Sequence, residues 1–84
     1  MKEGTILVVD DNPLNLKVLF QYLSDEGYRV LVAENGTSAI QQTRQALPDL
    51  VLLDVLMPGI NGFETCRRLK SDPVISEIPV IFLT

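Results

Sequence analysis

The sequence predicts an α/β fold built on an open parallel sheet, and three observations favour it. Short runs of aliphatic residues alternate along the chain with stretches whose apolar residues recur every three or four positions. Two of the aliphatic runs are uninterrupted, as is typical of strands in the middle of a parallel sheet. The order strand, helix, strand, helix, strand, helix, strand favours right-handed crossovers between parallel strands.

The first expected strand is Thr5–Val9, which is rich in β-branched residues and ends in two acids, Asp10 and Asp11. A helix should follow at once, because Asn12 is a good N-cap and Pro13 suits the first helical position. The apolar stripe that this helix turns toward the sheet should consist of Leu16, Leu19, Phe20 and Leu23.

A weaker strand pattern, Tyr28–Ala33, comes after a helix stop at Gly27 and is expected near an edge of the sheet. The segment Glu34–Thr37 predicts a turn into a second helix, which should end before Pro48. The residues expected on the inner side of this helix are Ala39, Ile40, Thr43 and Leu47.

The stretch Leu50–Leu53 predicts a central strand buried on both faces, and Asp54 stands at its carboxyl end. Because an unpaired buried charge is costly, an acid at such a position caps a turn, binds a cation or lies at an open edge of the fold. In open α/β sheets the carboxyl ends of the strands form the edge where ligands bind. Asp54 is therefore the first candidate for a functional residue.

A third helix is expected from about Gly62 to the terminating segment Ser71–Pro73, and a last strand over Val80–Thr84. The inner face of this helix should carry Phe63, Cys66 and Leu69. Cys66 is expected to be a small core residue rather than a redox centre.

Length and composition exclude several classes of protein. A chain of 84 residues with 46% hydrophobic residues is one globular domain, and its formal charge of 7 − 11 = −4 does not favour nucleic-acid binding. The single cysteine excludes an internal disulfide and, without an apolar N-terminal signal, predicts a cytoplasmic location. No apolar run reaches the roughly 18 residues that span a bilayer, and no glycine-rich nucleotide motif is present.

Three carboxylates, Asp10, Asp11 and Asp54, fall at the predicted carboxyl ends of two buried strands, and they converge if those strands are neighbours. Two unit charges about 5 Å apart repel by about 3 kcal/mol at an effective dielectric near 20, so a divalent cation or a shared proton is expected. All-oxygen ligands favour a hard ion, Mg²⁺ before Ca²⁺. The alternative is that Asp11 caps the first helix, Asp10 is solvated and Asp54 caps a turn.

Three segments resemble the receiver domain of two-component response regulators: ILVVDDNP at residues 6–13, LVLLDVLMPGING at 50–62 and IPVIFLT at 78–84. The resemblance implies a flavodoxin-like fold, whose strand order is 2-1-3-4-5. It also implies site roles: Asp54 as the phospho-acceptor, Thr84 as the switch hydroxyl, and Asp10, Asp11, Asp54 and the Leu56 backbone carbonyl as ligands of Mg²⁺.

The family continues beyond residue 84 with a fourth helix, a fifth strand that ends in a lysine, and a fifth helix. We therefore expect residues 1–84 to form a single truncated receiver domain, with a partial flavodoxin-like sheet of strand order 2-1-3-4. No lysine present is expected to replace the fifth-strand lysine, since Lys2, Lys17 and Lys70 are not suitably placed.

The function implied is that of a receiver module that takes a phosphoryl group onto Asp54. The donor must be a separate histidine kinase or phosphotransfer domain, because the chain contains no histidine. An enzyme of the haloacid dehalogenase type is not favoured, since that class of phosphatase has a second acid two residues after the nucleophile and Leu56 stands there.

A role in assembly is the alternative. The last strand should be an exposed edge, and Val80–Leu83 is the short, uncharged, β-prone type of segment that pairs with another chain. We expect a homo-oligomer formed through that edge or by exchange of segments, with no phosphotransfer.

Overall fold

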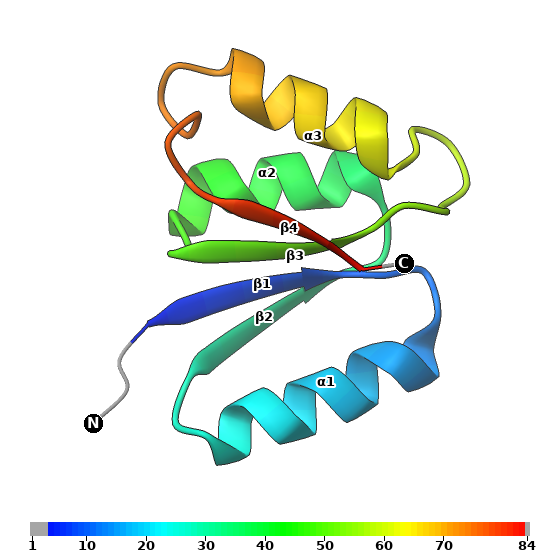
Figure 1. Cartoon of the computed structure of the whole chain (residues 1–84), viewed down its shortest axis with the longest axis vertical. Coiled ribbons are helices and arrows are strands. Elements are labelled where there is room, and N and C mark those ends of the chain that lie inside the picture. The colour runs from blue at the N-terminus through cyan, green and yellow to red at the C-terminus, as the bar shows by residue number, and fades with distance from the viewer. Residues whose placement is uncertain (1–3, 84) are drawn as a thin grey trace.

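Four parallel strands form one sheet in the order β2-β1-β3-β4, as the sequence predicts (Figure 1). The computed structural model describes residues 4–83. The elements are β1 (Thr5–Val9), α1 (Pro13–Asp25), β2 (Arg29–Ala33), α2 (Gly36–Ala46), β3 (Leu50–Asp54), α3 (Gly62–Ser71) and β4 (Val80–Leu83). The most strongly apolar runs, β1 and β3, are the two inner strands, and the predicted α/β class is confirmed.

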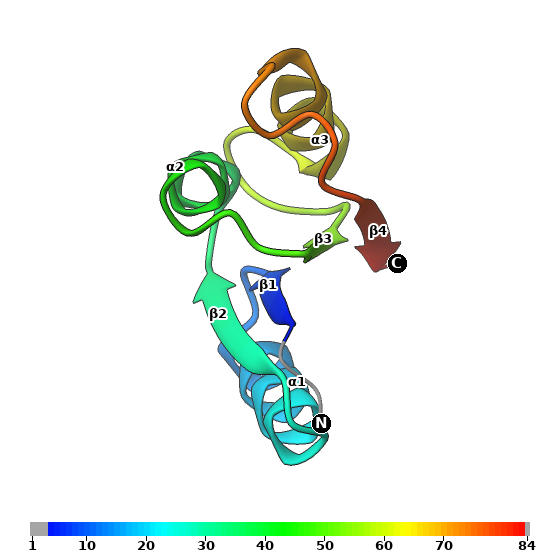
Figure 2. The same cartoon turned by 90° about the vertical axis from the view of Figure 1, so that its left-hand side faces the viewer.

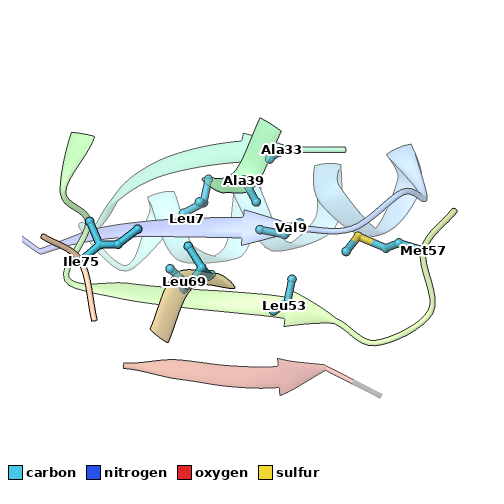
Figure 3. Packing of buried hydrophobic residues seen from close by; sticks show 9 residues of the cluster. Leu7, Val9, Ala33, Ala39, Leu53, Met57, Leu69 and Ile75 are labelled. Carbon is cyan, nitrogen blue, oxygen red and sulfur yellow. The ribbon is translucent and has the colours of Figure 1, made fainter. Parts of the chain in front are cut away.

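The helices cover the two faces of the sheet unequally. Figure 2 shows α1 on one side of the sheet and both α2 and α3 on the other. The larger core lies on the side of α2 and α3, where Leu7, Val51 and Leu53 are fully buried. Figure 3 shows how Ala39 of α2 and Leu69 of α3 approach this face of the sheet. The smaller core, under α1, contains Ile6, Val8, Leu16 and Val30.

Each helix begins at an asparagine whose side chain accepts backbone N–H groups of the first turn. Asn12 accepts from Leu14 and Asn15, Asn35 accepts from Ser38, and Asn61 accepts from Glu64. These caps satisfy donors that the helix itself cannot pair. None of the helices in the described part of the chain is long and apolar enough to cross a membrane.

Three residues predicted for the inner helix faces lie on the surface instead. Phe20 is 46% exposed on the outer side of α1, and Phe63 is 61% exposed near the start of α3. Leu47 is 55% exposed, because it lies past the end of α2 as a left-handed C-cap with φ of 50°. The inner side of α3 carries Gly62, Thr65 and Leu69, with Cys66 packed against the core as expected. Small residues occupy that side because α3 approaches the sheet and α2 closely.

The prediction that β3 is buried on both faces is half wrong. Val51 and Leu53 are fully buried under α2 and α3, whereas Leu50 and Leu52 on the opposite face are only partly buried. The reason is that α1 packs over β1 and β2 and leaves the β3–β4 part of that face uncovered. Among residues 4–83, β4 lies at an edge of the sheet, as predicted, with Ile81 and Phe82 exposed.

Leu53→Ala should lower the free energy of unfolding by about 2 to 5 kcal/mol, because it leaves a cavity in the larger core. Leu14→Ala removes the same atoms from an exposed position on α1 and should change the free energy of unfolding by no more than about 0.5 kcal/mol. Urea unfolding followed by circular dichroism measures both. Equal effects of the two variants would contradict the packing described above.

Candidate functional site

Asp10, Asp11 and Asp54 lie together at the carboxyl ends of β1 and β3. These strands are hydrogen-bonded neighbours in parallel register, with Val9 opposite Leu53, so both chains leave the sheet at the same level. One carboxylate oxygen of each aspartate lies within 4.8 Å of the other two. The convergence predicted from the sequence is confirmed.

Asp10 is the most firmly held of the three acids. Its side chain is buried, with 5% exposure, and its Oδ1 accepts a hydrogen bond of 2.9 Å from the backbone N–H of Asn12. Its Oδ2 accepts one of 3.2 Å from Nδ2 of Asn15. The alternative in which Asp10 is solvated is therefore wrong. Asn15 was not singled out in the sequence, where its only signal is a polar side chain in the first turn after the acids.

Asp11 remains exposed and does not cap α1, since Asn12 occupies the N-cap position. The carboxylate of Asp11 borders a surface hollow of about 470 Å³, whose other wall is the loop after β3, including Leu56 and Asn61. An acid that caps no helix and lies open to solvent beside two others is available for a ligand.

Asp54 is held at one oxygen by a turn of its own chain. Its Oδ1 accepts a hydrogen bond of 3.3 Å from the backbone N–H of Leu56, so the turn-capping alternative is correct for that oxygen. The pKa of Asp54 is nevertheless raised, first by partial burial of the carboxylate and then by the negative charges of Asp10 and Asp11. The Leu56 hydrogen bond lowers the pKa but does not offset these effects. The cluster is thus a place where a bound cation would be favourable.

The loop after Asp54 is fixed at both of its ends. Met57 is buried in the larger core (Figure 3), and the backbone N–H of Gly62 donates a hydrogen bond of 2.9 Å to the carbonyl oxygen of Val55. A Cβ at Gly62 would lie 2.3 Å from the carbonyl oxygen of Asp54, so no larger residue fits there. Gly62 therefore allows α3 to begin directly against the end of β3. The sequence indicated Gly62 only as a helix start.

Two further predictions concern Thr84 and Lys70. Thr84, the expected switch hydroxyl, lies outside the described residues. Lys70 donates from Nζ to the carbonyl oxygens of Ser76, at 3.2 Å, and Ile78, at 2.6 Å. This agrees with the expectation that Lys70 does not reach the acids.

The donor set fits a hard divalent cation. Three carboxylates supply only oxygen ligands, and two of the acids, Asp11 and Asp54, are accessible enough for water to complete the coordination. Asp10 is oriented by donors that use one lone pair on each oxygen, which leaves further lone pairs free. The Leu56 backbone lies next to Asp54, as a backbone carbonyl ligand would require.

Comparison with known proteins adds family information to this geometry. The profile of the response regulator receiver domain matches residues 6–84. The chain is 47% identical over 79 residues to the protein PilH of Pseudomonas aeruginosa, covering 94% of this chain and 65% of PilH. The chain is also 47% identical over 79 residues to the response regulator PleD of Caulobacter vibrioides, and this match covers 94% of the chain and 17% of PleD. The chain thus spans less than two thirds of these relatives.

Solved structures agree with the fold at high similarity. The N-terminal domain of a response regulator receiver protein from Methanoculleus marisnigri superposes with a TM-score of 0.95 at 43% identity, over 96% of this chain and 66% of that one. The receiver domain of the sensor histidine kinase PA1611 from Pseudomonas aeruginosa, with a magnesium ion coordinated in its active site cleft, has a TM-score of 0.93 at 30% identity. That match covers 99% of this chain and 68% of the other.

Asp54→Asn should raise the melting temperature at pH 7, because it removes one of three repelling charges. The raised pKa means that the folded protein binds a proton at Asp54 more readily than the unfolded chain does. The contribution of Asp54 to stability is therefore greatest below the unfolded pKa of about 3.8 and is lost as pH rises through the folded pKa. One charge pair at this spacing is worth about 1 kcal/mol in a water-like dielectric, or about 4 to 8 °C.

Thermal unfolding in metal-free buffer at several pH values checks this. The difference between Asp54→Asn and the unmodified chain should shrink as pH falls toward 4. Glu77→Gln, at an exposed position in the loop before β4, makes the same change in charge away from the cluster and should have little effect at any of these pH values. A destabilised Asp54→Asn at pH 7 would contradict the prediction.

Proposed function

Since the chain belongs to the response regulator receiver domain family, we propose that it accepts a phosphoryl group on Asp54 with the help of Mg²⁺. The observation that carries the proposal is the convergence of three carboxylates within 4.8 Å at the ends of two neighbouring strands. Buried packing holds these groups together against their mutual repulsion, which is the arrangement expected of a site that works with a cation.

Asp10, Asp11 and Asp54 would hold the magnesium ion, together with the backbone carbonyl of Leu56. The oxygen-only donor set supports this assignment, as does the magnesium ion in the receiver domain of PA1611, a relative of the same fold. When bound, Mg²⁺ supplies positive charge that offsets the repulsion between the carboxylates and an incoming phosphoryl group.

Asp54 is the proposed nucleophile. One of its carboxylate oxygens forms a bond to phosphorus while the bond from phosphorus to a donor imidazole nitrogen breaks, and that nitrogen is then protonated by solvent. The Leu56 N–H holds Oδ1, which leaves Oδ2 as the attacking oxygen. Asp10 cannot swing into the path of attack, because hydrogen bonds from Asn12 and Asn15 hold it. The hydroxyl of Thr84 is proposed to contact the transferred group.

The proposed donor is a separate histidine kinase or phosphotransfer domain, since the chain has no histidine. The module is regulatory rather than hydrolytic in this proposal, because the position two residues after Asp54 is Leu56, whose side chain cannot act as a second acid. A cytoplasmic location fits a reducing compartment for the free thiol of Cys66.

Incubation with acetyl phosphate and Mg²⁺ should add one phosphoryl group to the chain, read by intact mass. The modification should be absent without Mg²⁺ and absent in Asp54→Asn. Because the fifth-strand lysine of the family is not present in residues 1–84, the yield should be partial even at long times, since one lost contact in an electrostatic site costs a few kcal/mol.

Asp49→Asn is the matched control, because Asp49 is a carboxylate outside the cluster whose Oδ2 accepts from the Thr5 N–H. That variant should still be modified. Phosphorylation that persists in Asp54→Asn would overturn the assignment of the acceptor. If the folded chain is not modified in the presence of Mg²⁺, that result would favour a role in assembly without phosphotransfer.

The second candidate function is assembly without phosphotransfer, and the uncovered edge of the sheet favours it. β4 has no strand on its outer side within residues 4–83, and Ile81 and Phe82 are exposed on its two faces. Edge strands of this kind pair with other chains unless a charge or a covering segment prevents it. The chain would then form homo-oligomers through β4 or by exchange of segments.

Sedimentation velocity should detect dimers or larger species whose population rises with protein concentration. Ile81→Lys should reduce that population, because a lysine on an edge strand opposes pairing. Val18→Lys adds the same charge at an exposed position on α1 and should leave it unchanged. A folded monomer at the highest concentrations would contradict self-association.

A further inference from the structure

A groove is lined by residues of α2, of α3 and of the segment after α3. These two helices lie on the side of the sheet away from α1 (Figure 2). The groove consists of two adjoining hollows, of about 560 and about 450 Å³, which share Arg44 and Arg68 in their walls. We call it the α2–α3 groove. None of its lining residues borders the hollows beside Asp10, Asp11 and Asp54. The groove is therefore separate from the acidic cluster.

The charge of the groove is opposite to that of the chain. Three arginines, Arg44, Arg67 and Arg68, and one acid, Asp72, line it, which gives 3 − 1 = +2, whereas the whole chain carries −4. Glu64 stands beside the groove and pairs with two of these arginines, and the local sum including it is still +1. Three of the seven basic residues of an acidic chain thus face one groove.

Neighbouring carboxylates orient the arginines. Glu64 accepts from Nε of Arg67 at 3.0 Å, from Nη2 of Arg67 at 2.6 Å and from Nε of Arg68 at 2.8 Å. These hydrogen bonds, chiefly those of Arg67, lower the pKa of Glu64 to about 2, so the pairs persist at neutral pH. Asp72 pairs with Nε of Arg44 at 2.9 Å.

The outer ends of two guanidinium groups remain available. Within residues 4–83, the side-chain contacts of Arg44 and Arg68 go through Nε, so their terminal nitrogens are free to donate to a ligand. The two arginines are about half to two thirds exposed, which makes them accessible while their stems are anchored. Pre-oriented guanidinium groups lose less side-chain freedom when they bind a carboxylate.

The form of the groove favours a polypeptide over a small anion. It is open and extends along two helices, from Thr37 near the start of α2 to Val74 beyond the end of α3. Small ligands instead need an enclosed pocket that buries most of their surface. Half-buried Ile40 and exposed Val74 add apolar contact area beside the arginines. The phosphate backbone of a nucleic acid offers no apolar side chain for Ile40 and Val74 to contact, so arginines beside apolar residues favour a protein segment.

We propose that the α2–α3 groove binds an acidic, amphipathic segment of a partner protein. Carboxylates of that segment pair with Arg44 and Arg68, and an apolar side chain between them packs against Ile40. The interaction is independent of the proposed phosphorylation, because the groove shares no lining residue with the cluster of Asp10, Asp11 and Asp54.

The probe is a fluorescein-labelled peptide of about twelve residues that repeats glutamate and leucine at helical spacing. Fluorescence anisotropy with the 84-residue chain should detect binding at low salt, and affinity should fall as salt shortens the screening length. An analogue with glutamine at every glutamate position should bind at least tenfold more weakly. Absence of binding by the acidic peptide overturns the proposal.

Arg44→Gln and Arg68→Gln should each weaken binding about tenfold, as expected for the loss of one charge-assisted hydrogen bond. Arg29→Gln, on β2, makes the same change in net charge away from the groove and should change the affinity less than twofold. Melting temperatures are measured first, and Arg68→Gln decides the outcome if loss of the Asp72 pair unfolds Arg44→Gln.

Equal losses in all three variants would mean attraction by net charge alone and would overturn the proposal. Displacement of the peptide by inorganic pyrophosphate at concentrations comparable with those of free peptide would instead assign the groove to a small anion and would also overturn it. Weakening confined to the groove variants, with no competition by pyrophosphate, supports the acidic segment.

Discussion

The pairing of β1 with β3 is the constraint on which the rest of the structure depends. Their register brings Asp10 and Asp54 out of the sheet side by side, where a charge pair costs about 1 kcal/mol in a water-like dielectric and about 3 kcal/mol at an effective dielectric near 20. Opposing this cost, Leu7, Val9, Val51 and Leu53 are each fully buried, and burial of one such side chain is worth about 1.5 to 3 kcal/mol. Apolar packing thus holds together an acidic cluster that would otherwise disperse.

Much of the fold could be predicted because its signals are local. The continuous apolar runs of β1 and β3 identify the inner strands, and Asn12 with Pro13 identifies the start of α1. The errors on the helices arose because spacing alone does not say which of two adjacent stripes is buried. Phe63 fits the expected stripe of α3 as well as Thr65 does, yet Phe63 lies outside and packs on Phe82, with ring centroids 5.3 Å apart.

Some residues of the candidate site could likewise be predicted from local sequence signals, and others could not. The three aspartates could be predicted because they stand at the carboxyl ends of two strands, and parallel strands end at one edge. Asn15 and Gly62 could not, because their roles arise from contacts between separate elements: an amide that reaches back to Asp10, and a helix start that leaves no room for a Cβ beside Asp54. The α2–α3 groove is a further case, since its arginines come from two helices that meet only in the folded chain.

The cap of α3 also bears on the chemical ageing of the protein. Asn61–Gly62 is the type of dipeptide that cyclises readily to a succinimide, through attack of the glycine nitrogen on the asparagine side-chain carbonyl. In the folded chain that nitrogen donates to Val55, and the side-chain oxygen of Asn61 accepts from Glu64. Deamidation at this dipeptide should therefore proceed mainly through open or unfolded molecules, and its rate in storage would follow how often the start of α3 detaches from the sheet.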